Sequence, residues 1–435
     1  MEISNLYEAF LRGGGVSTDT RTIQPGQVFF ALKGENFNGD DYAGTALEKG
    51  ASLCVVSRSC ALEEGEKVVK VDDTLAALKE LAAWHRNHFL VDGERITLIG
   101  LTGTNGKTTT KELIREVLSK KYSVTATKGN LNNDVGVPLS VLSICPGTEI
   151  AVIEMGANHP DDIAELVKVS QPDYGLITNV GKAHLLGFGD FEGVKRAKGR
   201  LYDYISAEGK AVFANVDDPD INAMATSRGL SIIPYGLSYS SVEVLPSDAE
   251  HPFLRLKLGK KVINTSLVGS YNAINVLAAL TVGRYFGVPD RDAIMAIEAY
   301  VPSNNRSQMK RTERNSVVID AYNANPSSMK AALDNLAFFS GDKVLALGSM
   351  GELGAESLHE HEELLKRIDS IGAKEVILVG EEFAKAVKSL GGRDYKLFPN
   401  SDEACAYLME HPVNDCVVLV KGSRSTKMEN VIPAL

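Results

Sequence analysis

The segment from Gly100 to Thr110, GLTGTNGKTTT, has the composition of a phosphate-binding loop. An apolar run precedes it and an amphipathic segment follows it, so a strand, a loop and a helix come in the order that phosphate binding requires. In this arrangement Lys107 reaches the β- and γ-phosphates and the Thr108 hydroxyl can coordinate Mg²⁺. Leu101 stands where the general G-x-x-x-x-G-K-[ST] pattern has Gly, so the loop matches the shorter form G-T-N-G-K-T. A Gly-rich turn without function is the alternative, and the flanking segments disfavour it.

An acidic residue ends the next apolar run along the chain. Glu154 closes the segment IAVIE, and α/β folds bind ligands beside the carboxyl ends of their strands. Carboxylate oxygens are suitable ligands for Mg²⁺. A glutamate at a strand end is more often a solvated surface residue, so the function of Glu154 depends on what the fold brings next to it.

The composition indicates a globular protein with more than one domain. The chain has 435 residues, of which 44% are hydrophobic and 23% are charged, as is ordinary for soluble proteins. A single core rarely grows beyond roughly 250–300 residues, so we expect two or three domains. The net charge of −10 argues against a nucleic-acid or membrane-surface partner. An anionic ligand would therefore be held by local cations and backbone N–H groups.

Neither the cysteines nor the N-terminal segment indicates export. The five cysteines are odd in number and lack metal-ligand spacing, which favours reduced thiols and a cytoplasmic location. The opening MEISNLYEAFLRGG has no long apolar run. We therefore expect neither a signal peptide nor a segment inserted into a membrane.

Hydrophobic periodicity divides the chain into three regions. Residues 1–92 contain the strand-like runs QVFFAL and ASLCVVS and end at an Asp92-Gly93 pair that predicts a linker. In residues 93–304, apolar runs alternate with helical segments, which predicts a largely parallel sheet. Residues 305–435 alternate cleanly between strand and helix patterns, with Pro326 expected at a first helical position and Ser401 at an N-cap.

The predicted fold class is therefore α/β with three domains. A small N-terminal α/β domain precedes a central parallel sheet of the P-loop ATPase type, and a doubly wound, Rossmann-like domain follows it.

Several further segments, taken together, resemble the Mur ligases and their relative folylpolyglutamate synthase over nearly the whole chain. The combination of Y-N-A-N-P, M-x-E-L-G and K-G-S-R is similar to the members that add D-alanyl-D-alanine, and the D-N-P-R of the diaminopimelate- or lysine-adding members does not occur. The segments that carry the resemblance, besides the G-T-N-G-K-T loop, are IEMGANHP (153–160), NVGKAHLLGFG (179–189), KRAKGRLY (195–202), GSYNAINVLAA (269–279), IDAYNANPSSM (319–329), LGSMGELG (347–354) and VKGSRSTKME (420–429).

The resemblance implies an ATP-dependent ligase that activates a carboxylate as an acyl phosphate. It also implies two Mg²⁺ ions, one held by Thr108 and Glu154 and a second by Glu154 and His184. Arg306 resembles the arginine that reaches the phosphates from the domain linker, and it follows Asn305, where the family usually has Gly. The ATP-binding residues implied are Gly103, Thr104, Asn105, Gly106, Lys107, Thr108, Thr109, Asn272, Asn275, Arg306 and Asp320.

Lys198 resembles the lysine that this family carbamylates. A bare ammonium beside two Mg²⁺ ions would be repelled, whereas a carbamate is a carboxylate-like metal ligand. The lysine must be neutral to react with CO₂, and nearby cations lower its pKa. The alternative is an ordinary surface lysine on a basic helix. Together with Lys107, Glu154 and His184, Lys198 completes the expected catalytic set.

The resemblance also implies the two other substrates and the parts of the chain that bind them. UDP-N-acetylmuramoyl-tripeptide is expected on the first domain and D-alanyl-D-alanine on the last. The expected acceptor-binding residues are Ser17, Thr18, Thr20, Arg21, Lys33, Asn132 and Asn133. Those expected at the dipeptide are Tyr322, Asn323, Asn325, Lys421, Ser423 and Arg424. Around Thr18 and Thr20, a local hydrogen-bonded turn is the alternative.

Other functions compete with this hypothesis. A different Mur-type ligase or a folylpolyglutamate synthase is the closest alternative, and the latter should lack the uridine-binding domain. A nucleotide-binding scaffold should have lost some of the four expected catalytic residues, and a P-loop motor or GTPase should hydrolyse nucleotide without an acceptor. We expect a monomer whose last domain closes on the central one about a hinge at residues 303–306.

Overall fold

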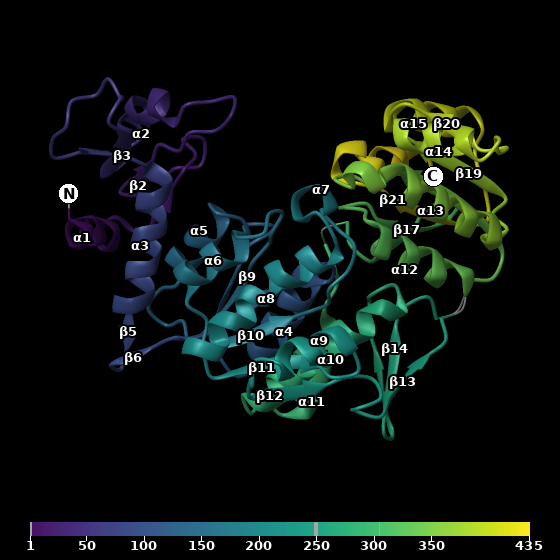
Figure 1. Cartoon of the computed structure of the whole chain (residues 1–435), viewed down its shortest axis with the longest axis horizontal. Coiled ribbons are helices and arrows are strands. Elements are labelled where there is room, and N and C mark those ends of the chain that lie inside the picture. The colour runs from purple at the N-terminus through teal and green to yellow at the C-terminus, as the bar shows by residue number, and fades with distance from the viewer. Residues whose placement is uncertain (1, 248–250, 304) are drawn as a thin grey trace.

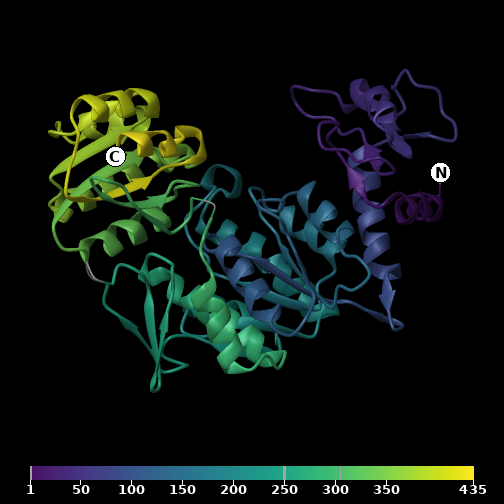
Figure 2. The same ribbon diagram turned by 180° about the vertical axis from the view of Figure 1, so that it is seen from behind.

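The computed structural model describes residues 2–247, 251–303 and 305–435. Each of the three larger sheets organises one part of the chain, and the central part lies between the N-terminal and C-terminal parts (Figures 1 and 2). No helix among the described residues is long and apolar enough to cross a membrane.

The N-terminal part is a four-stranded parallel sheet with three helices. Its strands run in the order β1-β2-β3-β4, and both predicted strands are confirmed as β2 and β3. The strands are β1 (Val16–Ser17), β2 (Val28–Phe30), β3 (Leu53–Ser57) and β4 (Val68–Val71). The helices are α1 (Ile3–Gly13), α2 (Ala43–Glu48) and α3 (Thr74–His88).

Helix α3 joins the N-terminal part to the central part. It begins at Asp73, whose carboxylate accepts hydrogen bonds from two free N–H groups of the first turn. The helix leaves the first sheet and reaches the side of the central part (Figure 1), where Leu78 and Leu81 share one core with central helices. Arg86, 3% exposed, donates to three backbone carbonyls and to Asp173 at 2.9 Å. This buried network fixes the end of α3 on the central part.

The central part is a six-stranded parallel sheet in the order β12-β11-β10-β7-β9-β8. Helices α4, α10 and α11 cover one face, and helices α5, α6 and α8 cover the other. The strands are β7 (Thr97–Thr102), β8 (Val124–Ala126), β9 (Ile150–Glu154), β10 (Tyr174–Ile177), β11 (Ala211–Asn215) and β12 (Ile232–Tyr235). The helices are α4 (Lys107–Leu118), α5 (Gly136–Leu142), α6 (Asp162–Ser170), α7 (Leu185–Phe188), α8 (Phe191–Glu208), α9 (Pro219–Thr226), α10 (Ala273–Tyr285) and α11 (Asp290–Ala299).

A three-stranded antiparallel sheet adjoins the central part, and the sequence did not lead us to expect it. Its strands are β13 (Val242–Leu245), β14 (Arg255–Leu258) and β15 (Lys261–Asn264). Leu256 and Ile263 face the core beneath α10 and α11, whereas alternate residues face solvent. This alternation over four-residue strands is a weak signal beside the continuous apolar runs of the buried parallel strands.

The C-terminal part is a six-stranded sheet in the order β16-β17-β21-β18-β19-β20, parallel except for the edge strand β16. Apolar cores lie on both of its faces. The strands are β16 (Gln308–Arg311), β17 (Ser316–Asp320), β18 (Asp342–Gly348), β19 (Glu375–Val379), β20 (Lys396–Phe398) and β21 (Cys416–Lys421). The helices are α12 (Pro326–Ala337), α13 (Ser357–Ile371), α14 (Glu381–Ser389) and α15 (Ser401–Glu410). The predicted fold class is confirmed.

Two local predictions in the C-terminal part have different outcomes. Pro326 is the first residue of α12, as predicted, and Asn325 caps that helix through the Ser328 N–H. The N-cap of α15 is Asn400, whose side chain accepts from the Glu403 N–H, so the prediction of Ser401 is wrong by one residue. Asn400 has the extended backbone of an N-cap, whereas Ser401 is already the first helical residue.

The predicted domain boundaries fall at two short connections. Asp92 and Gly93 form the two-residue turn of a small hairpin, β5 (Leu90–Val91) with β6 (Glu94–Arg95), and both have positive φ. Asn304 lies outside the described residues. Asn305 follows with φ +55°, a left-handed conformation that asparagine tolerates better than other non-glycine residues. The ranges 1–92, 93–304 and 305–435 stay a prediction.

His85 on α3 predicts a pH-dependent stability. Its ring is 1% exposed, donates from Nε2 to the Ile144 carbonyl at 2.9 Å and accepts at Nδ1 from the Tyr7 hydroxyl at 3.1 Å. Burial lowers the pKa of His85 to about 4. In the unfolded chain His85 binds a proton with a pKa near 6.5, whereas in the folded chain it does so only near pH 4. The folded state therefore loses stability as the pH falls from about 6.5 to about 4.

We expect the free energy of unfolding to fall by about 2–3 kcal/mol between pH 7 and pH 4.5 because of this one group. Urea unfolding followed by the fluorescence of Trp84, the only tryptophan, measures this contribution at the residue next to His85. In His85→Gln, which keeps a donor for Ile144 but does not titrate, this contribution should disappear. An equal pH dependence in both proteins would contradict the assignment.

Candidate active site

The loop between β7 and α4 requires glycine at two positions. Gly103 has φ +149° and Gly106 has φ +78°. A Cβ atom at Gly103 would lie 1.9 Å from the Thr178 hydroxyl, and one at Gly106 would lie 2.7 Å from the Asn275 side-chain oxygen. Only a residue without a side chain lets the loop turn back against these neighbours.

A second loop, after β10, holds the first one in place. The Asn179 side chain accepts from the Asn105 N–H at 3.0 Å and donates to the Asn105 carbonyl at 3.0 Å. The Thr178 hydroxyl donates to the same carbonyl at 2.7 Å. No role was assigned to Asn179 from the sequence. Its position just after a core strand was the one feature that could have indicated a role in the site.

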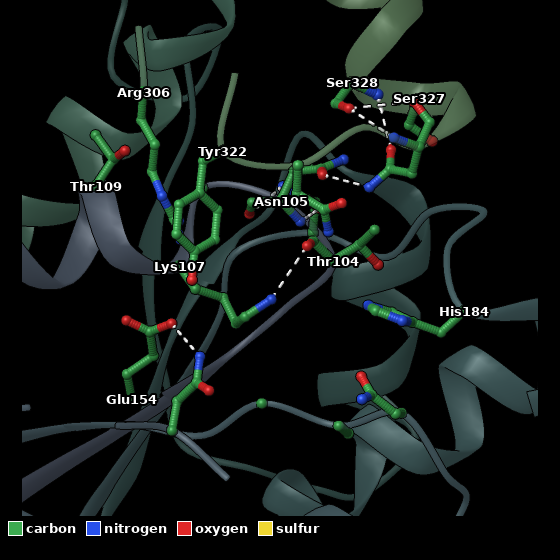
Figure 3. A pocket seen from close by; sticks show the side chains of 18 of the residues that line it. Thr104, Asn105, Lys107, Thr109, Glu154, His184, Arg306, Tyr322, Ser327 and Ser328 are labelled. Atoms are coloured by element: carbon green, nitrogen blue, oxygen red, sulfur yellow. Dashed lines mark hydrogen bonds between the residues drawn. The ribbon is translucent and has the colours of Figure 1, made fainter. Parts of the chain in front are cut away.

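Lys107 folds back onto its own loop. Its Nζ donates to the carbonyls of Gly103 at 2.8 Å and Thr104 at 3.1 Å (Figure 3). Burial, together with the charge of Arg306, lowers the pKa of Lys107 to about 8, against the opposing effect of Glu154. Neutral carbonyl oxygens bind an ammonium more weakly than anionic phosphate oxygens do. Lys107 can therefore exchange these carbonyls for the phosphate oxygens of a bound nucleotide.

Glu154 ends β9 as a completely buried carboxylate. One oxygen accepts from the Thr108 hydroxyl at 3.1 Å and from the Asn132 amide at 2.7 Å. The other oxygen has no hydrogen-bond donor in the described structure. A buried carboxylate oxygen without a donor is costly, and an oxygen ligand left free at a strand end fits a bound Mg²⁺.

Lys111 is a buried neighbour of Glu154 that was not predicted from the sequence. Its side chain is fully buried in α4, one turn after Lys107. The ammonium donates to the Thr127 carbonyl at 2.5 Å, pairs with Glu112 at 2.9 Å and lies 3.9 Å from the unpaired oxygen of Glu154. Lys111 therefore connects the phosphate-loop helix to the segment that begins at Thr127 and carries Asn132.

His184 and Lys198 both lie near Lys107 of the loop. His184 has φ +52° and contacts Glu352 of the C-terminal part through Nδ1. Burial lowers the pKa of His184, with smaller contributions from Lys107 and Lys198. Lys198, on α8, is 2% exposed, and its ammonium lies 5.8 Å from the centre of the Phe188 ring. No carboxylate of the described chain pairs with it.

Burial is also the main cause that holds the pKa of Lys198 well below its usual value, and the charge of Lys107 adds to it. A lysine in this environment has lost the hydration that favours the ammonium. The surface-lysine alternative is therefore wrong: Lys198 is one of the largest fully buried side chains of the described structure.

A cavity of about 730 Å³ brings these groups together with residues from all three parts. It extends from Lys79 on α3, past the phosphate loop, to Lys421 at the end of β21. The predicted site residues that line it are Thr104, Asn105, Gly106, Lys107, Thr109, Asn132, Asn133, Glu154, His184, Asn272, Asn275, Arg306, Asp320, Tyr322, Asn323, Asn325 and Lys421. In Figure 3 the side chains of Glu154, Arg306 and Tyr322 lie beside Lys107, whose ammonium points toward Thr104.

Asn272 and Asn275 belong to a buried polar network. Asn275 accepts from the Thr110 hydroxyl at 3.1 Å and donates to the Asn272 side chain at 2.9 Å. Asn272 in turn donates to the Val268 carbonyl at 2.8 Å and to Ser307 at 3.1 Å. The common alternative for a helical asparagine, an exposed side chain, is therefore wrong for both residues, which are 1% and 5% exposed.

Arg306 reaches the phosphate loop from the connection to the C-terminal part. Its Nη1 donates to the Thr108 hydroxyl at 2.8 Å, and its guanidinium lies 3.6 Å from the centre of the Tyr322 ring (Figure 3). Such a stacked cation is fixed in orientation. Asn325 also crosses to the loop, donating to the Asn105 side chain at 2.8 Å.

Lys421 is tied to Asp320 on the neighbouring strand. Its ammonium donates to the Asp320 carboxylate at 2.5 Å and to the Asn323 carbonyl at 3.1 Å, and its side chain is buried. Asp320 also accepts from the Ser307 N–H at 3.3 Å. The pair closes the end of the cavity formed by the C-terminal part.

The remaining predicted residues do not line the cavity. Gly103, Thr108 and Lys198 lie directly behind its lining. The Ser423 hydroxyl donates to the Ser349 carbonyl at 2.6 Å, and exposed Arg424 pairs with Glu429 at 2.6 Å. The five predicted residues of the N-terminal part lie away from the cavity: Ser17, Thr18, Thr20, Arg21 and Lys33.

The alternative of a local turn is present in the N-terminal part. The Ser17 hydroxyl donates to the Asp19 carbonyl at 3.0 Å, and Arg21 pairs with the Asp19 carboxylate at 2.6 Å. The hydrogen bonds from Arg21 lower the pKa of Asp19 to about 2. Arg21 and Lys33 are exposed, so both cations face solvent on this part of the molecule.

The chemistry available in the cavity is that of a phosphate site with one completely buried carboxylate, Glu154. Among the described residues no group of three or more His, Cys, Asp or Glu gathers in a metal-binding cluster. A cation at Glu154 would therefore complete its coordination with hydroxyl and ligand oxygens, as Mg²⁺ does at nucleotide phosphates.

Three family models match successive stretches of the chain. They are described as Mur ligase family, catalytic domain (residues 14–86), Mur ligase middle domain (residues 101–283) and Mur ligase, glutamate ligase domain (residues 305–424). The chain is 34% identical over 430 residues to the UDP-N-acetylmuramoyl-tripeptide–D-alanyl-D-alanine ligase of Escherichia coli (strain K12), which covers 97% of this chain and 93% of the relative. Identity to the Bacillus subtilis (strain 168) protein of the same name is 32% over 433 residues, with 97% and 93% covered.

Solved structures agree over the same length. A crystal structure of MurF from Acinetobacter baumannii has a TM-score of 0.85 at 30% identity and covers 99% of this chain and 97% of that one. The MurF ligase from Thermotoga maritima in complex with ADP has a TM-score of 0.82 at 27% identity, with 97% and 96% covered. The chain therefore belongs to the Mur ligase family.

Proposed function

We propose that this protein joins D-alanyl-D-alanine to UDP-N-acetylmuramoyl-tripeptide at the expense of ATP, giving the pentapeptide precursor of peptidoglycan, ADP and phosphate. The observation that carries the proposal is the single cavity in which the phosphate loop, Glu154 and residues of the C-terminal part meet. Full-length similarity to ligases of that name supports the choice of substrates.

The reaction needs a carboxylate oxygen of the acceptor to attack the γ-phosphorus of ATP. The new O–P bond forms the acyl phosphate as the bond to ADP breaks, and the dipeptide amine then displaces phosphate from the acyl carbon. Lys107 leaves the loop carbonyls to bind the transferred phosphoryl group, and Arg306, held by Tyr322, lies where it can neutralise the same charge. Asn272 and Asn275 would hold the adenine side and Asp320 the ribose.

Two Mg²⁺ ions are the proposed cofactors with ATP. Thr108 and Glu154 would hold one of them, and Glu154, His184 and a carbamylated Lys198 would hold the other. When bound, Mg²⁺ supplies charge neutralisation and polarises the phosphoryl group. The donor-free oxygen of Glu154 and the buried, unpaired Lys198 are the features of this chain that support the assignment.

The two other substrates approach the phosphate loop from opposite ends of the cavity. Asn132 and Asn133, on the side of α3, would line the acceptor peptide, and the exposed groups of the N-terminal part would bind its uridine diphosphate. Tyr322, Asn323, Asn325 and Lys421 would face the dipeptide. Since Lys421 is already paired with Asp320, we propose that it positions this wall, and Ser423 and Arg424 support the same region. A monomer acting in the cytoplasm is the proposed working form.

The proposed reaction predicts stoichiometric products. With Mg-ATP, UDP-N-acetylmuramoyl-tripeptide and D-alanyl-D-alanine, we expect equal amounts of ADP, phosphate and UDP-linked pentapeptide by chromatography and mass spectrometry. Phosphate release should require the acceptor, because the phosphoryl group has no other nucleophile in a water-poor site. Folate as acceptor and the Lys107→Met variant are the controls, and both should give no product.

Steady ATP hydrolysis without any acceptor would instead favour a simple nucleotide hydrolase. Product formation with folate and not with the muramoyl tripeptide would favour the folylpolyglutamate synthase alternative.

Carbamylation of Lys198 predicts chemical rescue. We expect Lys198→Ala to lose about 100-fold or more in kcat, because an outer or direct metal ligand is removed, and to regain part of it with added formate or acetate. Lys195→Ala, on the same helix but paired with Glu192 and Asp220, should retain activity within about twofold. Full activity of Lys198→Ala, or no gain with either anion, would rule out the carboxylate role.

A further inference from the structure

The M-x-E-L-G segment of the C-terminal part has no role in the reaction described above. Its acidic residue, Glu352, lies in the loop that follows β18 and adopts φ +60°. A non-glycine residue in the left-handed region is uncommon and strained. The surrounding contacts must hold Glu352 in this conformation.

Those contacts reach across to the central part. The Glu352 carboxylate lies in close contact with Nδ1 of His184, and the Glu352 backbone carbonyl accepts from the Leu186 N–H at 3.2 Å. Nδ1 of His184 is buried and has no other partner in the described structure. Both the side chain and the backbone of Glu352 therefore bind the segment that contains His184 and Leu186.

His184 is itself held in an unfavourable conformation. Its φ is +52°, so two left-handed non-glycine residues face each other across the interface between the parts. Strain of this kind persists where the structure fixes a side chain for a task. The ring that results lines the cavity and points toward Lys107 (Figure 3).

The charges around His184 give Glu352 a specific effect. The cations Lys107 and Lys198 face the ring from the central part, and Glu352 faces it from the C-terminal part. A carboxylate at Nδ1 keeps a proton on that nitrogen and leaves the lone pair on Nε2, as carboxylates behind metal-bound histidines do. Without Glu352, either nitrogen could carry the proton and the ring could turn.

We propose that Glu352 is a positioning residue that sets the orientation and tautomer of His184, and that it can do so only while the C-terminal part is docked. This proposal rests on the proposed function for its kinetic consequence. On this proposal, the His184 ring has the required orientation and tautomer only when the C-terminal part, which would carry the dipeptide, is docked on the central part.

A second ion pair on the same segment supplies the control. Lys182 pairs with Glu360 of α13 at 2.6 Å, so it also crosses the interface but does not touch His184. Lys182→Met removes one interface charge without changing what faces the imidazole. Glu352→Ala removes one interface charge and the partner of Nδ1.

The direct test is NMR of protein labelled with ¹⁵N-histidine, with the His184 signals assigned by their loss in His184→Asn. We expect the Nδ1–H tautomer in the wild type and in Lys182→Met, and a mixture or the Nε2–H tautomer in Glu352→Ala. This readout requires no substrate. An unchanged His184 tautomer in Glu352→Ala would overturn the proposal even if the ligase reaction is correct.

The kinetic test uses a double-mutant cycle. Glu352→Ala should lower kcat about 10–100-fold with the KM for ATP within about twofold, and Lys182→Met should stay within about twofold of wild type in kcat. In a His184→Ala background, Glu352→Ala should have little further effect, because it acts through that ring. The same loss in both backgrounds would overturn the positioning role, whereas an inactive wild type with the expected tautomers would count only against the proposed reaction.

Discussion

The carboxylate of Glu154 is completely buried at the end of a parallel strand. Burying this charge is energetically unfavourable, and the residues around it are arranged to compensate. A buried carboxylate is tolerated only when cations and donors surround it. Thr108 and Asn132 satisfy one oxygen, and Lys111 approaches the other from behind. That second oxygen accepts no hydrogen bond from the described residues. The parallel sheet brings the phosphate loop, this carboxylate and the Asn179 loop to one edge because successive strands end there.

The three parts of the chain contribute different things to that edge. Helix α3, fixed by Arg86 and His85, anchors the N-terminal part and contributes Lys79 to the lining of the cavity. The C-terminal part meets the loop through Asn325 and the His184 segment through Glu352 and Glu360. The described structure is therefore a docked arrangement, in which residues far apart in sequence share one polar cavity.

The outcome of the sequence analysis depended on whether a signal was local. Glycines at 103 and 106, and the order of strand, loop and helix, identified the phosphate loop because the geometry is built within one segment. The roles of Lys111, Asn179 and Glu352 were not identified, because they arise from partners 16 to 168 residues away along the chain. Ser423 and Arg424, which supply a hydroxyl and a cation, were predicted to bind the dipeptide. In the structure Ser423 donates to the Ser349 carbonyl and Arg424 pairs with Glu429.

The retention of magnesium beside the nucleotide is proposed to depend most on the charge of Glu154. Calorimetric titration with a non-hydrolysable ATP analogue, with and without Mg²⁺, tests this in the wild type and in Glu154→Gln, which keeps the shape and removes the charge. We expect Mg²⁺ to strengthen binding about tenfold or more in the wild type and to have little effect in Glu154→Gln, with comparable metal-free affinities. An equal gain from Mg²⁺ in both proteins would contradict the central claim.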